Sequence, residues 1–295
     1  MRKTTNIKYI ALMTVAMSLV WIVSAGVLMG IAGHVQVETV DLVDSAISSL
    51  SLVLVSLLNV LVIAWFINRS HLHGFKLAVR VFFLMFGVMF FMTQIETLFF
   101  NSAVQMPLPV VLATFGSGAM SILVVALLAI PYRRKLGPVT EPTLEIAPSG
   151  NGLKLLALGL IYMVFYFVFG YYTAWQVPGL RAFYTGSTEI APFGQHMVGI
   201  LRSELALPVF QIVRGLMWAG FGLAALTALT NAKAWERTLL VGLLLSVGLA
   251  TPLFVPNEFM PPIVRLGHFF ELLAENFLFG VLVALFFRPS LRTNT

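Results

Sequence analysis

Apolar runs of about 20 residues recur along almost the whole chain, separated by short polar breaks. A helix of that length spans the roughly 30 Å hydrocarbon layer of a bilayer. Charged residues make up only 10% of the 295 residues, whereas an ordinary soluble domain has roughly 25%. A water-soluble fold could not bury so much apolar surface. The sequence therefore predicts an all-α polytopic membrane protein that lies in a lipid bilayer.

The apolar runs predict eight transmembrane helices, which puts both chain termini on the same side of the membrane. The first run follows Arg2 and Lys3 as a signal peptide would, but its length exceeds the 7–15 residues of a signal core, so we expect a retained helix. The expected spans are Lys8–Gly33, Ala46–Asn68, Leu77–Asn101, Pro107–Pro131, Leu153–Trp175, Leu207–Asn231, Thr238–Val255 and Ile263–Phe287.

The distribution of Lys and Arg predicts the orientation. Four of the 18 basic residues fall on one side of the expected spans, and the other fourteen fall on the side of the N-terminus. Basic residues near span ends are retained in the cytoplasm, so we expect both termini to be cytoplasmic in a cell membrane. The net charge of +6 is then explained by the basic residues on the cytoplasmic side, and it does not support a nucleic-acid partner. The four residues on the outer side are Arg181, Arg202, Arg214 and Arg265.

Loop composition predicts two four-helix halves. The inner loop 136–152 is rich in Pro and Gly and is expected to link a first half, residues 1–135, to a second half, residues 153–295. The outer loop 176–206 is long enough to hold a short amphipathic surface helix. The opening sequences of the halves resemble each other, which suggests two parallel repeats related by an axis along the membrane normal. Alternatively, any two apolar helices that begin near a lysine look alike.

Ionisable residues inside the spans are the candidates for function. The chain has no cysteine, which excludes thiolate metal sites and cysteine nucleophiles, and it has no nucleotide-binding or hydrolase motif. Charged groups in hydrocarbon cost several kcal/mol unless they are paired or hydrated. In the last span Arg265, His268, Glu271 and Glu275 are spaced three, three and four residues apart. This spacing places all four on one helix face.

Polar residues of other helices are expected to join this face in one cluster that opens outward. Acids outnumber arginines there, so an excess acid must be protonated, hydrated or bound to a cation. We expect His268, Glu271 and Glu275 to carry out the chemistry. The residues expected to bind a substrate or an ion are Glu96, Gln94, Gln211, Arg214, Glu258, Arg265, Arg181 and Arg202.

Three functions fit such a cluster. The first is a proton- or cation-linked transporter of a small solute. The second is an intramembrane enzyme that acts on a lipid or lipid-linked substrate at the outer leaflet, in which His268 and the acids bind a metal or His268 is a general base oriented by Glu271. The third is a structural subunit whose buried charges only pair with one another. The sequence indicates no particular metal or cofactor, because the span contains only one histidine that could provide a nitrogen ligand.

The charge asymmetry predicts which loops face the cytoplasm. A reporter fused after Arg134 should lie in the cytoplasm, and one inserted near Gly186 should lie outside. Alkaline phosphatase and green fluorescent protein fusions measure the two locations. The reverse result at either position would overturn the orientation.

Overall fold

The computed structural model describes residues 2–33, 42–138, 144–146, 151–229, 232–288 and 290–291. Within these residues, eight helices are long and apolar enough to cross a membrane, which confirms the predicted number. The chain is an all-α polytopic integral membrane protein. The spans are Asn6–Ile31, Ala46–Arg69, Gly74–Phe99, Leu108–Lys135, Gly152–Gln176, Ala206–Ala228, Ala234–Phe254 and Pro262–Phe286.

Some spans contain more than one helical element. The third span runs through α3 (Gly74–Phe86), the π-helix η1 (Gly87–Phe91) and α4 (Met92–Phe99). The other helices are α1 (Arg2–Ile31), α2 (Leu42–Arg69), α5 (Asn101–Val104), α6 (Leu108–Lys135), α7 (Asn151–Tyr172), η2 (Ala174–Gln176), α8 (Pro178–Thr185), α9 (Phe193–Ser203), α10 (Ala206–Ala228), α11 (Ala234–Ala250), η3 (Thr251–Phe254) and α12 (Pro262–Phe286). Two-residue strands, β1 (Leu144–Glu145) and β2 (Ser290–Leu291), pair antiparallel.

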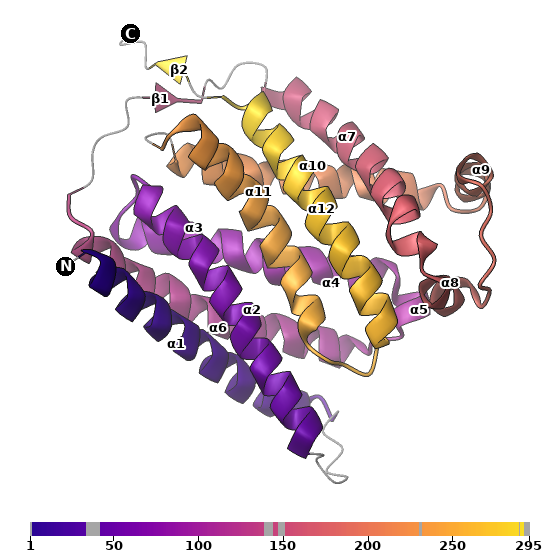
Figure 1. Ribbon diagram of the computed structural model, residues 1–295, viewed down its shortest axis with the longest axis horizontal. Coiled ribbons are helices and arrows are strands. Elements are labelled where there is room, and N and C mark those ends of the chain that lie inside the picture. Colours follow the sequence, from indigo (N-terminus) through magenta and orange to yellow (C-terminus); the bar gives the residue numbers. More distant parts are fainter. Residues whose placement is uncertain are drawn as a thin grey trace.

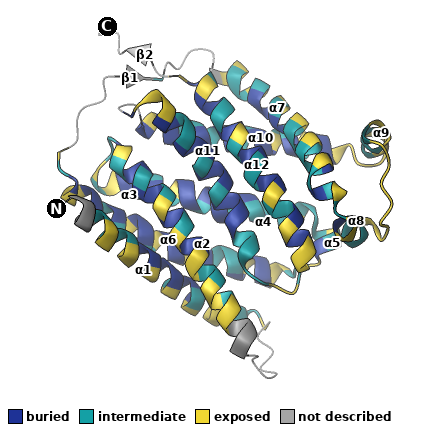
Figure 2. Cartoon of the chain, in the orientation of Figure 1, coloured by how far each residue is buried: buried dark blue, intermediate teal, exposed yellow. Residues whose placement is uncertain are grey.

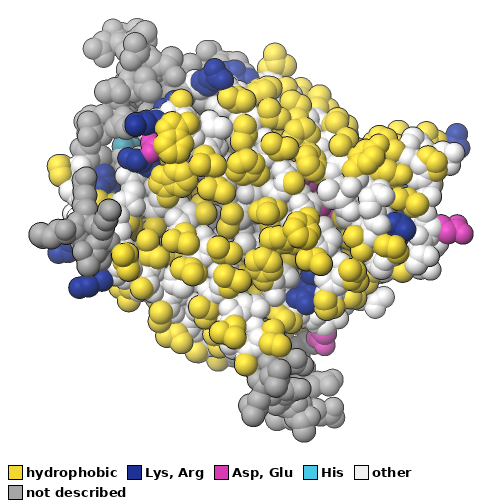
Figure 3. Space-filling view, in the orientation of Figure 1, with side chains coloured by type: hydrophobic (Ala, Val, Ile, Leu, Met, Phe, Trp, Pro, Cys, Tyr) yellow, Lys and Arg dark blue, Asp and Glu magenta, His cyan; other side chains and the backbone are white. Residues whose placement is uncertain are grey.

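The start of α1 and the end of α12 lie on the same side of the helix bundle (Figure 1). We call this side, where α1 begins and α12 ends, the terminal face, and the side with α5, α8 and α9 the loop face. The pairing of β1 with β2 joins the segment between α6 and α7 to residues that follow α12. Basic side chains gather at the terminal face, and hydrophobic side chains cover the helices between the faces (Figure 3). Which face is cytoplasmic stays a prediction.

Each span buries one stripe of apolar residues and exposes another (Figure 2). In α1, Met13 and Met17 are fully buried, and Trp21, one turn further, is 8% exposed. Val15 and Leu19 point the other way and are more than half exposed. The two stripes follow from the helical repeat of 3.6 residues. Exposed apolar stripes of this kind are covered by acyl chains when the helix lies in a bilayer.

The helix pairs follow the same pattern in both parts of the chain. In the first, α1 packs against α2 and α6, and α3 packs against α6. In the second, α7 packs against α10 and α12, and α11 packs against α12. Contacts of α2 with α11 and of α3 with α10 connect the two groups. Two parallel four-helix repeats would make these pairs, but the division into halves itself stays a prediction.

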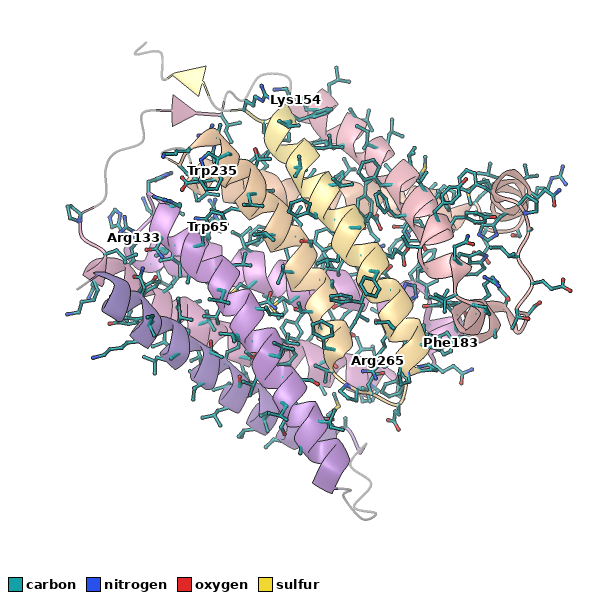
Figure 4. The ribbon with its side chains drawn as sticks, in the orientation of Figure 1. Trp65, Arg133, Lys154, Phe183, Trp235 and Arg265 are labelled. Carbon is teal, nitrogen blue, oxygen red and sulfur yellow. The ribbon has the colours of Figure 1, made fainter. Side chains whose placement is uncertain are left out.

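The terminal face holds α2 and α11 together through an ion pair and an aromatic contact. Arg69 Nη2 lies 2.5 Å from Glu236 Oε1. The rings of Trp65 and Trp235 are 6.2 Å apart, and Figure 4 shows the two side chains near the same end of the bundle. Both tryptophans lie near span ends, where aromatic residues are typical of the membrane interface. These contacts connect the two groups of helices beside the membrane surface.

Glycines let α11 and α12 approach backbone to backbone. A Cβ atom on Gly280 would lie 2.7 Å from the Cα of Gly242 and 2.8 Å from the carbonyl oxygen of Val241. Small residues at such positions are the usual means of close packing between membrane helices. The contact fixes α12, which carries the predicted site residues, against α11.

The close packing of Gly280 predicts a large difference between two glycine substitutions. Gly280→Ala should destabilise the protein by about 1–3 kcal/mol, because the new methyl group meets backbone atoms that cannot move aside. Gly220→Ala is the control, since no atom lies within 4 Å of the Cβ position of Gly220. Thermal melting of the purified protein in detergent measures both, and equal melting temperatures would contradict the packing argument.

Candidate functional site

A buried ion pair joins the third and sixth spans. Arg214 of α10 is completely buried, and its Nη2 lies 2.6 Å from Oε2 of Glu96 in α4. Its Nη1 donates a 2.9 Å hydrogen bond to Oε1 of Gln211. The guanidinium carbon lies 5.8 Å from the ring centre of Tyr162 and 5.7 Å from that of Phe210. The arginine charge is therefore balanced by one carboxylate and enclosed by two aromatic rings.

A series of hydrogen bonds leads from the loop face into α12. The hydroxyl of Tyr184, in α8, lies 3.0 Å from Nε2 of His268. Nδ1 of His268 lies 2.7 Å from Oε2 of Glu271, one turn further along α12. Burial raises the pKa of the Tyr184 phenol, so this hydroxyl is a neutral donor. A neutral imidazole would accept at Nε2 and donate from Nδ1 to Glu271, whereas a protonated imidazole would donate from both nitrogens, to the Tyr184 hydroxyl and to Glu271.

Glu275 lies one turn beyond Glu271, near the middle of the eighth span. At 1.5 Å per residue it is about 20 Å from the start of α12 at Pro262 and about 17 Å from its end at Phe286. The side chain is completely buried, and neither carboxyl oxygen has a hydrogen-bond partner among the described residues. Glu271, Arg214 and Glu96 are its charged neighbours. A bare carboxylate here would be costly, so the site favours a proton or a cation on Glu275.

Other buried polar atoms around Glu275 also lack partners within the part of the chain that the structure describes. The hydroxyl of Tyr162 faces Glu275 and Trp218 without reaching hydrogen-bonding geometry with either. Buried polar groups are almost always hydrogen-bonded to protein or to ordered water. A group of such atoms is thus suited to hold water or a polar ligand. The atoms are Tyr162 Oη, Trp218 Nε1 and, on the residue that binds Arg214, Gln211 Nε2.

The structure brings together most of the predicted residues of the membrane interior. Glu96 of α4, Gln211 and Arg214 of α10, and His268, Glu271 and Glu275 of α12 lie in the loop-face half or the middle of the bundle. Gln94 is also buried on α4, but it lies two residues before Glu96, about half a helical turn away, and therefore on a different face of that helix. Glu96 and His268 lie at the margin of this cluster, since each side chain is 22% exposed.

The predicted residues of the outer loops lie apart from this cluster. Arg181 donates through Nη1 to the carbonyl oxygen of Trp175 at 2.5 Å and through Nε and Nη2 to that of Thr188. It therefore fastens the segment around α8. Arg265 lies at the loop-face end of α12 (Figure 4) and donates a long 3.5 Å hydrogen bond to the carbonyl oxygen of Leu253. The two remaining residues, Arg202 and Glu258, are exposed.

Three site residues were not predicted from the sequence. Tyr184 is in a short helix of the outer loop whose position relative to His268 only the fold determines. Gly170 leaves room for an acid, because a Cβ atom there would lie 2.9 Å from Oε1 of Glu271. Tyr162 could have been predicted from the sequence, because it lies far from both ends of its span, where a hydroxyl group needs a polar partner.

The second histidine of the loop face is not a partner of the cluster. The His196 ring on α9 lies 5.0 Å from the ring of Trp175 and 5.6 Å from that of Tyr171. Burial against these rings lowers the pKa of His196. Among the described residues, no group of three His, Cys, Asp or Glu side chains could hold a metal ion.

A polar pair joins α2 to the first residue of η3, which directly follows α11. Asn59 Nδ2 donates a 2.8 Å hydrogen bond to Oγ1 of Thr251. Beside it is a cavity of about 10 Å³, lined by Asn59, Val88, Gly248 and neighbouring apolar residues. This is the volume open to the centre of a water molecule, and it is enough for about one water. The interior of the bundle therefore has room for one water molecule beside this pair.

The ion pair between Glu96 and Arg214 predicts strong coupling in a double-mutant cycle. Arg214→Gln and Glu96→Gln should each destabilise the protein, because each leaves the other charge without its partner. The double variant should recover part of the loss, with a coupling free energy of about 1–3 kcal/mol. Melting of the four proteins in detergent measures the cycle. Additive single effects would mean that the two side chains do not interact.

Comparison with known proteins adds no family to this description. No protein-family model matches the chain. No curated protein and no solved structure matches it either. The site is therefore interpreted from its own chemistry, in a chain that is a polytopic integral membrane protein.

Proposed function

We propose that the protein is a proton-linked transporter of a small solute in which Glu275 binds the proton. The observation that carries this proposal is the carboxyl group of Glu275, fully buried near the middle of its span with neither oxygen bonded to the described residues. Ionisable residues in this position mark proton relays and substrate paths in membrane proteins. A protonated Glu275 removes the cost of the buried charge and leaves a polar group that a solute can contact.

The hydrogen-bonded series from the loop face supplies a route for the proton. A proton that arrives at Nε2 of His268 allows Nδ1 to release its own proton to Oε2 of Glu271, 2.7 Å away. Glu271 and Glu275 are four residues apart on one helix face, where side chains are neighbours. The last transfer, from Glu271 to Glu275, needs a bridging water or a change of side-chain rotamer.

Arg214 can couple the proton to the packing of the helices. It is paired with Glu96, and it is also a charged neighbour of Glu275. When Glu275 loses its proton, its negative charge competes with Glu96 for the same guanidinium group. The equilibrium between the arrangements of α4, α10 and α12 then depends on whether Glu275 is protonated. Such coupling is what a proton-linked transporter requires.

The pair of His268 and Glu271 also supports a second candidate, an intramembrane enzyme. A histidine whose Nδ1 is held by a carboxylate has the arrangement of an oriented general base. His268 is partly exposed near the loop face, where a lipid or lipid-linked substrate would reach it. The enzyme needs His268 and Glu271 but has no evident use for the buried Glu275.

Substitution of Glu275 tests the proposal. Wild-type protein in proteoliposomes that contain a pH-sensitive dye should acidify the lumen when a pH gradient and fractions of a small-molecule cell extract are supplied outside. Glu275→Gln should lose this solute-dependent acidification, because an amide cannot carry the proton, while the melting temperature changes little. Glu189→Gln is the matched control, since Glu189 is exposed on the loop face.

The remaining outcomes separate the alternatives. If no fraction causes acidification and the wild-type protein instead converts added lipids in a manner that depends on His268, the enzyme is correct and the transporter is wrong. If Glu275→Gln keeps full acidification, Glu275 is not the proton-binding group. A loss of melting temperature without any effect on flux or turnover would indicate a structural role.

A further inference from the structure

A cavity on the terminal face lies outside the cluster described above. Its volume is about 330 Å³, at the lower end of the range for ligand pockets in proteins. It lies where the third span begins and the fourth span ends, as marked by Gly74 and Lys135. In Figure 4 Arg133 lies at that end of the bundle. The lining includes His73, Gly74, Ile130, Arg133, Arg134 and Gly137.

The lining of this cavity favours an anion. It contains two arginines and one histidine, and none of the described residues that line it is acidic. Arg134 is exposed, so its guanidinium group can turn toward a ligand. Guanidinium groups bind phosphate through paired, charge-assisted hydrogen bonds. The charge and the hydrogen-bond donors of the lining therefore point to the same class of ligand.

The start of α3 contributes to the same preference. His73 is the N-cap residue of this helix, its side chain does not bond the first turn, and that turn contains no acid. The N–H groups at a helix start carry a partial positive charge and bind phosphate groups readily. The third span begins at Gly74, which itself lines the cavity, so this end of the helix borders the cavity.

We infer that this cavity is a binding site for a phosphate group in a ligand of net negative charge, the chemistry shared by an acidic phospholipid headgroup and free phosphate. Its depth suits a headgroup, because it lies level with the ends of two spans. Its lining also contains the apolar Ile130, and Phe75 beside it is 75% exposed. Basic pockets between membrane helices bind acidic lipid headgroups in this way. The site is separate from Glu275 and does not depend on the proposed transport.

The test uses the full-length protein in detergent and three probes: short-chain phosphatidylglycerol, short-chain phosphatidylcholine and inorganic phosphate. Melting temperature is measured as each probe is titrated. Phosphatidylglycerol should stabilise the wild-type protein, and Arg134→Gln should raise the half-saturating concentration about fivefold, as loss of one basic group near a headgroup predicts. Arg288→Gln is the matched control, an exposed arginine of the same face that does not line the cavity.

The results with the three probes and the variants identify the ligand or overturn the inference. Stabilisation by phosphatidylglycerol alone identifies a lipid headgroup, and stabilisation by inorganic phosphate as well identifies a site for the phosphate group itself. Arg134→Lys, which keeps the charge, should retain part of the effect. Equal weakening by Arg288→Gln and Arg134→Gln would overturn the inference, because the effect would then be the general charge of this face. Equal stabilisation by phosphatidylcholine, or none by any probe, would overturn it too.

Discussion

The cost of charge in a medium of low dielectric constant governs the interior of this protein. Each buried charge has to be balanced by a partner, removed by a proton or solvated by water, because hydrocarbon offers none of these. Arg214 is balanced by Glu96 at 2.6 Å, and His268 is bonded to both Tyr184 and Glu271. Glu275 has no such partner among the described residues. Arg214 and His268 are thus held by fixed partners, whereas Glu275 is available to gain or lose a proton.

The architecture could be predicted because hydrophobicity and charge act locally along the chain. Apolar runs such as Leu108–Lys135 are long enough to cross a bilayer, and their number and approximate ends follow from the sequence alone. The helix face that carries His268, Glu271 and Glu275 was also predictable, since spacing along one helix fixes direction around it. Both inferences need no knowledge of how the helices pack.

The details of the cluster depend on packing, which the spacing of residues does not encode. Arg265 follows the same helical spacing as His268 but lies at the end of α12, bonded to a backbone carbonyl. Arg181 is an outer-loop arginine that could have bound a ligand, and the fold directs it to the carbonyl oxygens of Trp175 and Thr188. The bond from Tyr184 to His268 spans 84 positions of the chain. Such contacts follow from tertiary structure alone.

The π-helix η1 has a consequence for the ion pair between Glu96 and Arg214. A π-helical turn holds one more residue than an α-helical turn, so everything after it is rotated by about 100° relative to a regular helix. Gly87 within it accommodates the ring of Phe221, and a Cβ atom there would overlap that ring. The direction of Glu96, two turns later, is therefore set by one surplus residue in the third span. A chain one residue shorter at η1 would keep all eight helices, yet its glutamate would point away from the arginine.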